Sequence, residues 1–192
     1  YREYVYDGEK QVSMLEFPEI AEHSIIIDSE SKRYSMCGVR IGCLVTRSKT
    51  LHDAAMKFAQ ARLSPVLIGQ ILATAAHDND AEYIQSVREE YTKRRNLLVE
   101  LLNEIPGVKC PTPKGAFYCV AELPVEDADD FAQWLLEHFS DNGETVMVAP
   151  ASGFYSVPEL GKKQVRIAYV LKEEDLRRSV ELIKIALEQY KK

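Results

Sequence analysis

Short apolar runs give way to amphipathic segments along the first half of the chain. Three successive isoleucines within His23 to Asp28 predict a strand buried on both faces, as in a parallel or mixed sheet between helices. A second strand, rich in β-branched and small residues, is predicted over Val39 to Thr46. From Leu51 the apolar positions recur at helical spacing, and Ser64-Pro65 marks a break before a new helix.

The second half begins with a long amphipathic helix over Asp80 to Ile105, which Pro106-Gly107 ends. At 1.5 Å per residue this helix is about 39 Å long, which suits a connection between two domains. Shorter elements follow and predict a compact α+β unit. The predicted strands cover Val108–Cys110, Phe117–Glu122, Thr145–Val148 and Gln164–Val170, and the predicted helices cover Ala128–Phe139 and Glu173–Tyr190.

Composition excludes several classes of function. With 192 residues, 46% hydrophobic, the chain can bury a real core in one large or two small domains. A net charge of -6 with scattered positive residues argues against a nucleic-acid partner. No stretch approaches the roughly 20 apolar residues that span a bilayer, so no membrane partner is expected.

The cysteines and histidines do not indicate a disulfide framework or a metal site. Four cysteines without CxxC pairing favour reduced thiols in a cytosolic protein. Four histidines without metal-ligand spacing are interpreted as structural or exposed. The chain begins without methionine, which favours a fragment whose start is missing.

Lys32 is the strongest candidate for chemistry. It follows the predicted strand between hydroxyl side chains, and Arg40 returns eight positions later. An amine that loses its proton can attack a carbonyl to form a Schiff base, and a guanidinium offers a planar fork to phosphate oxygens. This spacing therefore suggests binding of a phosphate-bearing aldehyde. An isolated Ser-x-Ser-Lys run is more often a polar loop.

The complete segment from Ser29 to Gly42 resembles the active-site segment of fold-type I, pyridoxal-phosphate-dependent aminotransferases of the aspartate aminotransferase (class I/II) family. That family's pattern is Ser-x-Ser-Lys-x-x-x-x-x-Gly-x-Arg-x-Gly, and every specified position is met. Two downstream segments, Pro113 to Tyr118 and Gln164 to Tyr169, also resemble the family. Tyr1 fits the tyrosine of its Asp-x-x-Tyr motif.

The resemblance implies an α/β fold in which this chain is about the second half of such an enzyme. Residues 1–77 would be the C-terminal part of the large cofactor-binding domain, with mixed-sheet strands and helices. Residues 78–105 would be the long connecting helix, and residues 106–192 the small α+β domain. The family's phosphate loop, ring-stacking aromatic and pyridine-pairing aspartate would precede the chain, so we expect this chain alone to be inactive.

The resemblance also implies the roles of the site residues. Lys32 would bind pyridoxal 5'-phosphate covalently and then move the substrate's α-proton. Ser29, Ser31 and Arg40 would hold the cofactor phosphate, and Tyr1 would hydrogen-bond its phenolic oxygen. No metal is expected.

Two further arginines would contact substrates. Arg166 would pair with the α-carboxylate of the amino acid, although an arginine on an alternating strand can equally be solvated. Arg62, near the implied dimer interface, is a weaker candidate for a distal carboxylate, and a solvated helix end is its ordinary interpretation. The loop Val148 to Gly161 would border the substrate entrance.

The leading hypothesis is the C-terminal half of an aminotransferase that moves an amino group between an amino acid and a 2-oxo acid, in a cytoplasmic homodimer serving amino-acid metabolism and biosynthesis. A carbon–sulfur lyase on the same fold would use the same residues. A non-catalytic, aminotransferase-like regulatory domain remains open and would need a DNA-binding segment upstream. A folding unit that merely self-associates through exposed apolar surface is the fourth alternative.

Overall fold

A computed structural model describes residues 1–78 and 80–190 of the chain. Residue 79, in the predicted connecting helix, and residues 191–192, in the predicted terminal domain, lie outside the described residues. The chain divides into two compact units, Tyr1–Arg88 and Glu89–Lys192. The predicted domain boundaries at residues 77 and 105 stay predictions.

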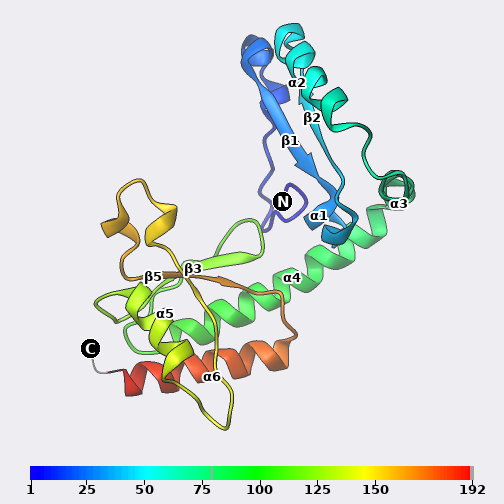
Figure 1. The fold of residues 1–192 in the computed structure, drawn as a ribbon. Helices are drawn as coiled ribbons and strands as arrows, with labels where there is room; N and C mark the ends of the chain where they lie inside the picture. Colours follow the sequence, from blue (N-terminus) through cyan, green and yellow to red (C-terminus); the bar gives the residue numbers. More distant parts are fainter. Residues whose placement is uncertain (79, 191–192) are drawn as a thin grey trace. The chain divides into compact units, whose positions relative to one another are not determined.

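The first unit is built on two antiparallel strands. Strand β1 (Ile25–Ser29) pairs with β2 (Gly42–Thr46) in a register that sets Ser29 opposite Gly42. The short helix α1 (Glu30–Arg33) follows β1 directly, so the predicted loop around Lys32 is a helical turn (Figure 1). The remaining elements are 3-10 turns at Met14–Glu16, Pro18–His23 and Cys37–Val39, and the helices α2 (Lys49–Arg62) and α3 (Leu67–His77).

The burial predicted for the isoleucine run is wrong in this chain. Ile25 is 44% exposed and Ile27 is 73% exposed, because β2 covers only the edge of β1 and no second layer lies over these side chains among the described residues of the first unit.

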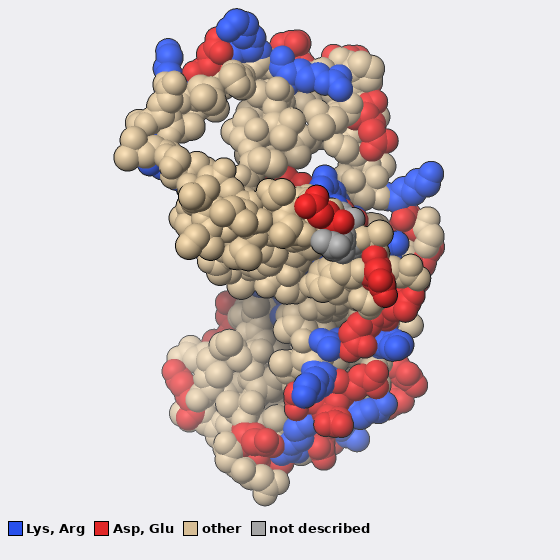
Figure 2. All heavy atoms as spheres, turned by 90° about the vertical axis from the view of Figure 1, so that its right-hand side faces the viewer, with Lys and Arg blue, Asp and Glu red and all other residues tan. Residues whose placement is uncertain are grey.

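Pro65 precedes α3 and is not part of its first turn. Figure 2 shows a large uncharged surface over α3, which contains no acidic or basic residue except His77.

Helix α4 (Asp80–Asn103) crosses the boundary between the two units and confirms the predicted long helix, two residues shorter at its end. The second unit has a three-stranded antiparallel sheet in the order β3-β5-β4. Its strands are β3 (Tyr118–Glu122), β4 (Ala149–Pro150) and β5 (Gln164–Ala168), and its other elements are α5 (Ala128–Glu137), α6 (Glu173–Gln189) and 3-10 turns at Ser152–Phe154 and Pro158–Gly161.

Two predicted strands of this unit are wrong. Thr145–Val148 is irregular, and the strand that joins the sheet is the next dipeptide, Ala149–Pro150, paired with Arg166 and Val165. Val108–Cys110 contributes only one isolated bridge, Lys109 to Glu122. The register of Ala149 opposite Arg166 and Pro150 opposite Val165 decides which residues join β5, and Lys109 bridges β3 and not β5.

The core of the second unit lies between the sheet and its helices. The sheet face formed by Cys119, Ala121 and Val165 is at most 2% exposed. Fully buried side chains of the helices complete this core: Leu98, Leu102, Phe131, Leu135, Leu176 and Ile183. Full burial of one such side chain contributes about 1.5–3 kcal/mol. This layer is therefore the main stabilising element of the unit. The opposite sheet face, which carries Arg166, is left for other contacts.

Candidate functional site

The turn that carries Lys32 is capped by a serine. Ser29 ends β1 in an extended conformation, and its hydroxyl accepts a hydrogen bond from the Ser31 N–H at 3.1 Å. The two serine hydroxyls lie 2.9 Å apart. The cap begins α1 directly at the end of the strand, so both hydroxyls and the lysine emerge within one helical turn.

Lys32 is exposed, and within the described residues its ammonium forms no hydrogen bond or ion pair. Its backbone carbonyl accepts a hydrogen bond from the Tyr4 hydroxyl at 2.7 Å. Tyr4 is 2% exposed, and its ring lies 6.4 Å from that of Tyr1. The N-terminal segment with Tyr1 is thus tied to the lysine turn, and the amine itself stays available.

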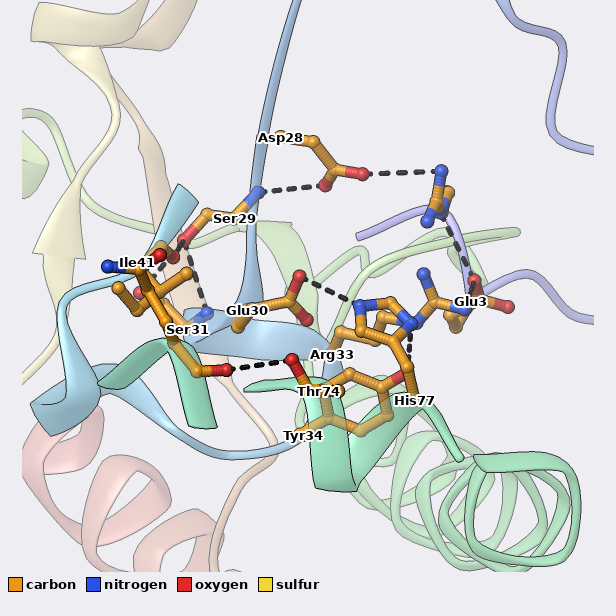
Figure 3. A network of polar contacts seen from close by, with 12 residues as sticks. Glu3, Asp28, Ser29, Glu30, Ser31, Arg33, Tyr34, Ile41, Thr74 and His77 are labelled. Atoms are coloured by element: carbon orange, nitrogen blue, oxygen red, sulfur yellow. Dashed lines mark hydrogen bonds and ion pairs between the residues drawn. The ribbon is translucent and has the colours of Figure 1, made fainter. Parts of the chain in front are cut away.

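The acidic residues around this turn are all compensated (Figure 3). Asp28 pairs with Arg2 at 3.2 Å and accepts the Ser29 N–H. Glu3 pairs with Arg33 at 3.2 Å. Glu30 contacts His77 at 3.0 Å. Asp28 and Glu3 are thus charge-paired with arginines, and Glu30 is hydrogen-bonded to the imidazole, around the turn that carries Lys32.

Arg40 stands in a left-handed backbone conformation, with φ 59° and ψ 42°, at the end of the Cys37–Val39 turn. Such a conformation costs a non-glycine residue about 1–2 kcal/mol, so it is retained where the surrounding structure or a function requires it. The guanidinium donates to the Cys37 carbonyl at 2.7 Å and forms no ion pair in the described part of the chain. Its remaining N–H groups can bind an anion.

Close backbone approach at the strand pair explains Gly42. A Cβ there would lie 2.6 Å from the Asp28 carbonyl oxygen, far inside normal contact. Glycine thus lets β2 approach the end of β1, which brings Arg40 and Ser29 to one rim of the sheet.

A pocket of about 290 Å³ opens at this rim. Its lining consists of Ser29, Ser31, Arg40, Ile41, Gly42 and Arg62. Arg62 ends α2 and, like Arg40, forms no ion pair with any described residue. The structure therefore brings together, in one pocket, the two serines and two of the arginines that the sequence singles out.

Arg166 lies in the second unit, on the middle strand β5 opposite Val120 and Ala149. Its guanidinium carbon lies over two rings, 4.6 Å from the centroid of Tyr118 and 4.8 Å from that of Phe154. It forms no ion pair within residues 80–190. Contact with the rings leaves N–H groups of the guanidinium available to a carboxylate.

Sequence reasoning missed Tyr4, Glu30 and His77 as neighbours of Lys32. Glu30 and Tyr34 flank the lysine two residues away on either side, which could have indicated a shared helix face opposite the lysine. No sequence signal connects them with His77, 43 residues beyond Tyr34.

These residues fit a phosphorylated aldehyde. A dianionic phosphate needs several donors when it leaves water, and two hydroxyls and two uncompensated guanidinium groups line one pocket. The unpaired amine of Lys32 belongs to the same turn as the hydroxyls. No group of three or more metal-binding side chains gathers among the described residues, and none of their helices is long and apolar enough to cross a membrane.

Comparison with known proteins agrees with this chemistry. The family model of class I and II aminotransferases matches residues 1–183. Aspartate aminotransferase from Bacillus subtilis (strain 168) is 31% identical, with 99% of this chain and 48% of that protein covered. The crystal structure of the aspartate aminotransferase from Rhizobium meliloti superposes with a TM-score of 0.83 at 29% identity, over 98% of this chain and 48% of that one.

An aromatic aminotransferase from Pyrococcus horikoshii OT3 gives a TM-score of 0.85 at 26% identity, over 98% of this chain and 49% of the other. The chain thus spans about half the length of the relatives that it matches. Because the family model covers almost the whole sequence, this chain belongs to the class I and II aminotransferase family.

Proposed function

We propose that the protein carrying these residues is a pyridoxal-phosphate-dependent aminotransferase that transfers an amino group between an amino acid and a 2-oxo acid. The observation that carries this proposal is the rim of the β1–β2 sheet. There two serines and two arginines without ion pairs line one pocket, and an unpaired lysine amine belongs to the same turn as the serines. Family membership and the names of the relatives add independent support.

Lys32 would hold the cofactor through its Nζ and later take the proton from the substrate's α-carbon and return it. When bound, pyridoxal 5'-phosphate supplies an electron sink that makes this proton removable. The Tyr4 hydroxyl, which holds the Lys32 carbonyl, and the Ser29 cap fix the backbone from which the amine swings. With its backbone fixed, the flexible Lys32 side chain could reach both the cofactor and the substrate's α-carbon without movement of the turn.

The phosphate would lie against Ser29, Ser31 and Arg40. Arg62 lines the same pocket, which supports a role for it in anion binding; the distal carboxylate suggested by the sequence stays a prediction. Tyr1 would hydrogen-bond the cofactor's phenolic oxygen, with its place beside Tyr4 as support.

Arg166 would bind the substrate's α-carboxylate through its free N–H edge. Contacts with two aromatic rings restrict the guanidinium, which favours bidentate pairing. Phe154 belongs to the loop Val148–Gly161, so movement of this loop would change the surroundings of Arg166.

We further place the protein in the cytoplasm as a homodimer. All four cysteines are unbridged thiols, and unpartnered apolar side chains on α2 and α3, including Phe58 at 79% and Leu67 at 69% exposure, are suited to a subunit interface.

The test is a transamination assay of the protein that carries residues 1–192, with aspartate, aromatic amino acids and alanine as donors and 2-oxoglutarate as acceptor. We expect amino transfer that Lys32→Ala abolishes. Arg166→Lys should raise KM for every donor more than it lowers kcat, because the lost fork serves binding.

Release of ammonia and pyruvate without an acceptor would instead establish a lyase. A wild-type protein with neither activity in the presence of the cofactor would refute the proposal and favour a regulatory role.

A further inference from the structure

Glu30 and Tyr34 lie four residues apart, on the same side of the turn that carries Lys32. At about 100° per residue, a side chain midway between them projects to the opposite side. The turn thus has one face directed at α3 and another that presents the lysine. The contacts of the first face are not used by the proposed chemistry.

His77, the last residue of α3, connects both members of that face (Figure 3). Its Nε2 lies 3.0 Å from Glu30 Oε1, and its Nδ1 lies 3.1 Å from the Tyr34 hydroxyl. The Tyr34 and His77 rings meet edge to face at 5.2 Å. A neutral imidazole with its proton on Nε2 satisfies both contacts, since it donates to Glu30 and accepts from Tyr34.

The contacts are partly buried, with the His77 side chain itself 43% exposed. Tyr34 is 8% exposed, and the Glu30 side chain retains 17% of its exposure. The second carboxylate oxygen of Glu30 is buried and accepts no hydrogen bond from any described residue. The His77 N–H is therefore the one side-chain donor to this carboxylate among the described residues, and its loss would leave a half-buried carboxylate without a side-chain hydrogen bond.

The position of Glu30 matters because Ser29 and Ser31, its neighbours in sequence, line the same pocket. Loss of the hydrogen bond that anchors Glu30 would let the turn move, and the two serines with it. Arg33 and Lys32 belong to the same turn, and Arg33 is already paired with Glu3. From the α3 side the titratable neighbours are His77 itself and the adjacent Asp78, and from α4 Tyr83, whose ring lies 6.2 Å from Tyr34.

We infer that His77 is a positioning residue: through Glu30 and Tyr34 it holds the Ser29–Lys32 turn in the geometry that binds a phosphate beside the reactive amine. The inference rests on the proposed function and adds to it a residue remote from the reacting atoms. It predicts that replacing His77 lowers the preference of Lys32 for a phosphorylated aldehyde over the same aldehyde without phosphate.

The experiment uses the full 192-residue chain. Pyridoxal 5'-phosphate or pyridoxal is added at equal concentration, borohydride traps the adduct, and peptide mass spectrometry quantifies label on Lys32. The ratio of the two trapping constants reports phosphate binding and is insensitive to the general exposure of the amine. The variants are His77→Ala, His77→Gln and Glu30→Ala, and the matched control is His52→Ala, which removes another histidine paired with a carboxylate, Asp53 at 3.3 Å.

We expect His77→Ala and Glu30→Ala to lower the ratio about tenfold, the effect of losing one charge-assisted hydrogen bond. His77→Gln should restore most of the ratio, since its amide can still donate to Glu30, and His52→Ala should leave it unchanged. Circular dichroism checks each variant. Where His77→Ala does not fold, the Gln and Glu30 variants decide the question.

The outcomes separate the two claims. A wild-type chain without any phosphate advantage at Lys32 would overturn the inference, whereas the proposed function is refuted by the absence of amino transfer in the protein that carries residues 1–192. A wild-type advantage that His77 and Glu30 variants all preserve, or that His52→Ala removes equally, would overturn the inference alone.

Discussion

Gly42 offers a sharp perturbation of the strand pair that supports the lysine turn. A Cβ added there would meet the Asp28 carbonyl oxygen at 2.6 Å and the Ser29 Cα at 3.5 Å. Ordinary contact begins near 3.4 Å, so the two backbones would have to separate by about 0.8 Å at the end of the β1–β2 ladder. Because both neighbours are backbone atoms, no side-chain rotation can relieve the contact.

Overpacking against a backbone that must shift costs typically about 1–3 kcal/mol, and we take about 2 kcal/mol for Gly42→Ala. At a factor of ten for each 1.4 kcal/mol, this corresponds to about 30-fold faster exchange of amide hydrogens in the two strands. The same shift moves Ser29 away from Arg40, so trapping of pyridoxal 5'-phosphate on Lys32 should also weaken.

The assay is hydrogen exchange with mass spectrometry on peptides covering Ile25–Ser29 and Gly42–Thr46. The matched control is Gly38→Ala in the same connection, where an added Cβ has no neighbour within 4 Å. Equal exchange in the two alanine variants would refute the reasoning, because backbone contact is the main difference between the sites.

Two predictions concern the second unit. Phe131→Ala should destabilise it by about 3–5 kcal/mol, since this ring is fully buried, whereas Leu136→Ala, at 56% exposure on the same helix, should cost far less; urea denaturation followed by Trp134 fluorescence measures both. The hydrogen bond from Lys109 lowers the pKa of Glu122 below its usual value, so the stabilisation it gives is present above the unfolded pKa near 4.3 and is lost as pH falls through the folded pKa. In Lys109→Gln the Glu122 pKa, followed by NMR, should rise; an unchanged value would show that another group sets it.

The sequence predicted the elements that have strong local signals. Helix α5 begins at Ala128 as predicted, where Asp127 caps it through the Asp129 N–H, and the long helix α4 begins at the predicted residue. The strands predicted on either side of Lys32 do pair, with Ser29 opposite Gly42, where glycine permits the close approach. Local spacing carried this information.

Features that depend on distant partners could not be predicted. The isoleucines of β1 indicated a buried strand, but hydrophobicity alone does not reveal whether the elements that would cover the strand lie among the described residues. The Ala149–Pro150 strand is fixed by its neighbour β5 and not by its own propensity. His77 joins Glu30 only because α3 packs back against α1, a tertiary contact without a sequence pattern.

The central claim is that Lys32 binds the aldehyde of the cofactor. Borohydride trapping of pyridoxal 5'-phosphate on the 192-residue chain, with every labelled lysine mapped, tests it most directly. The account predicts that Lys32 takes most of the label, ahead of Lys49, whose side chain is 86% exposed but paired with Asp53. Label distributed among the lysines according to exposure alone would contradict it.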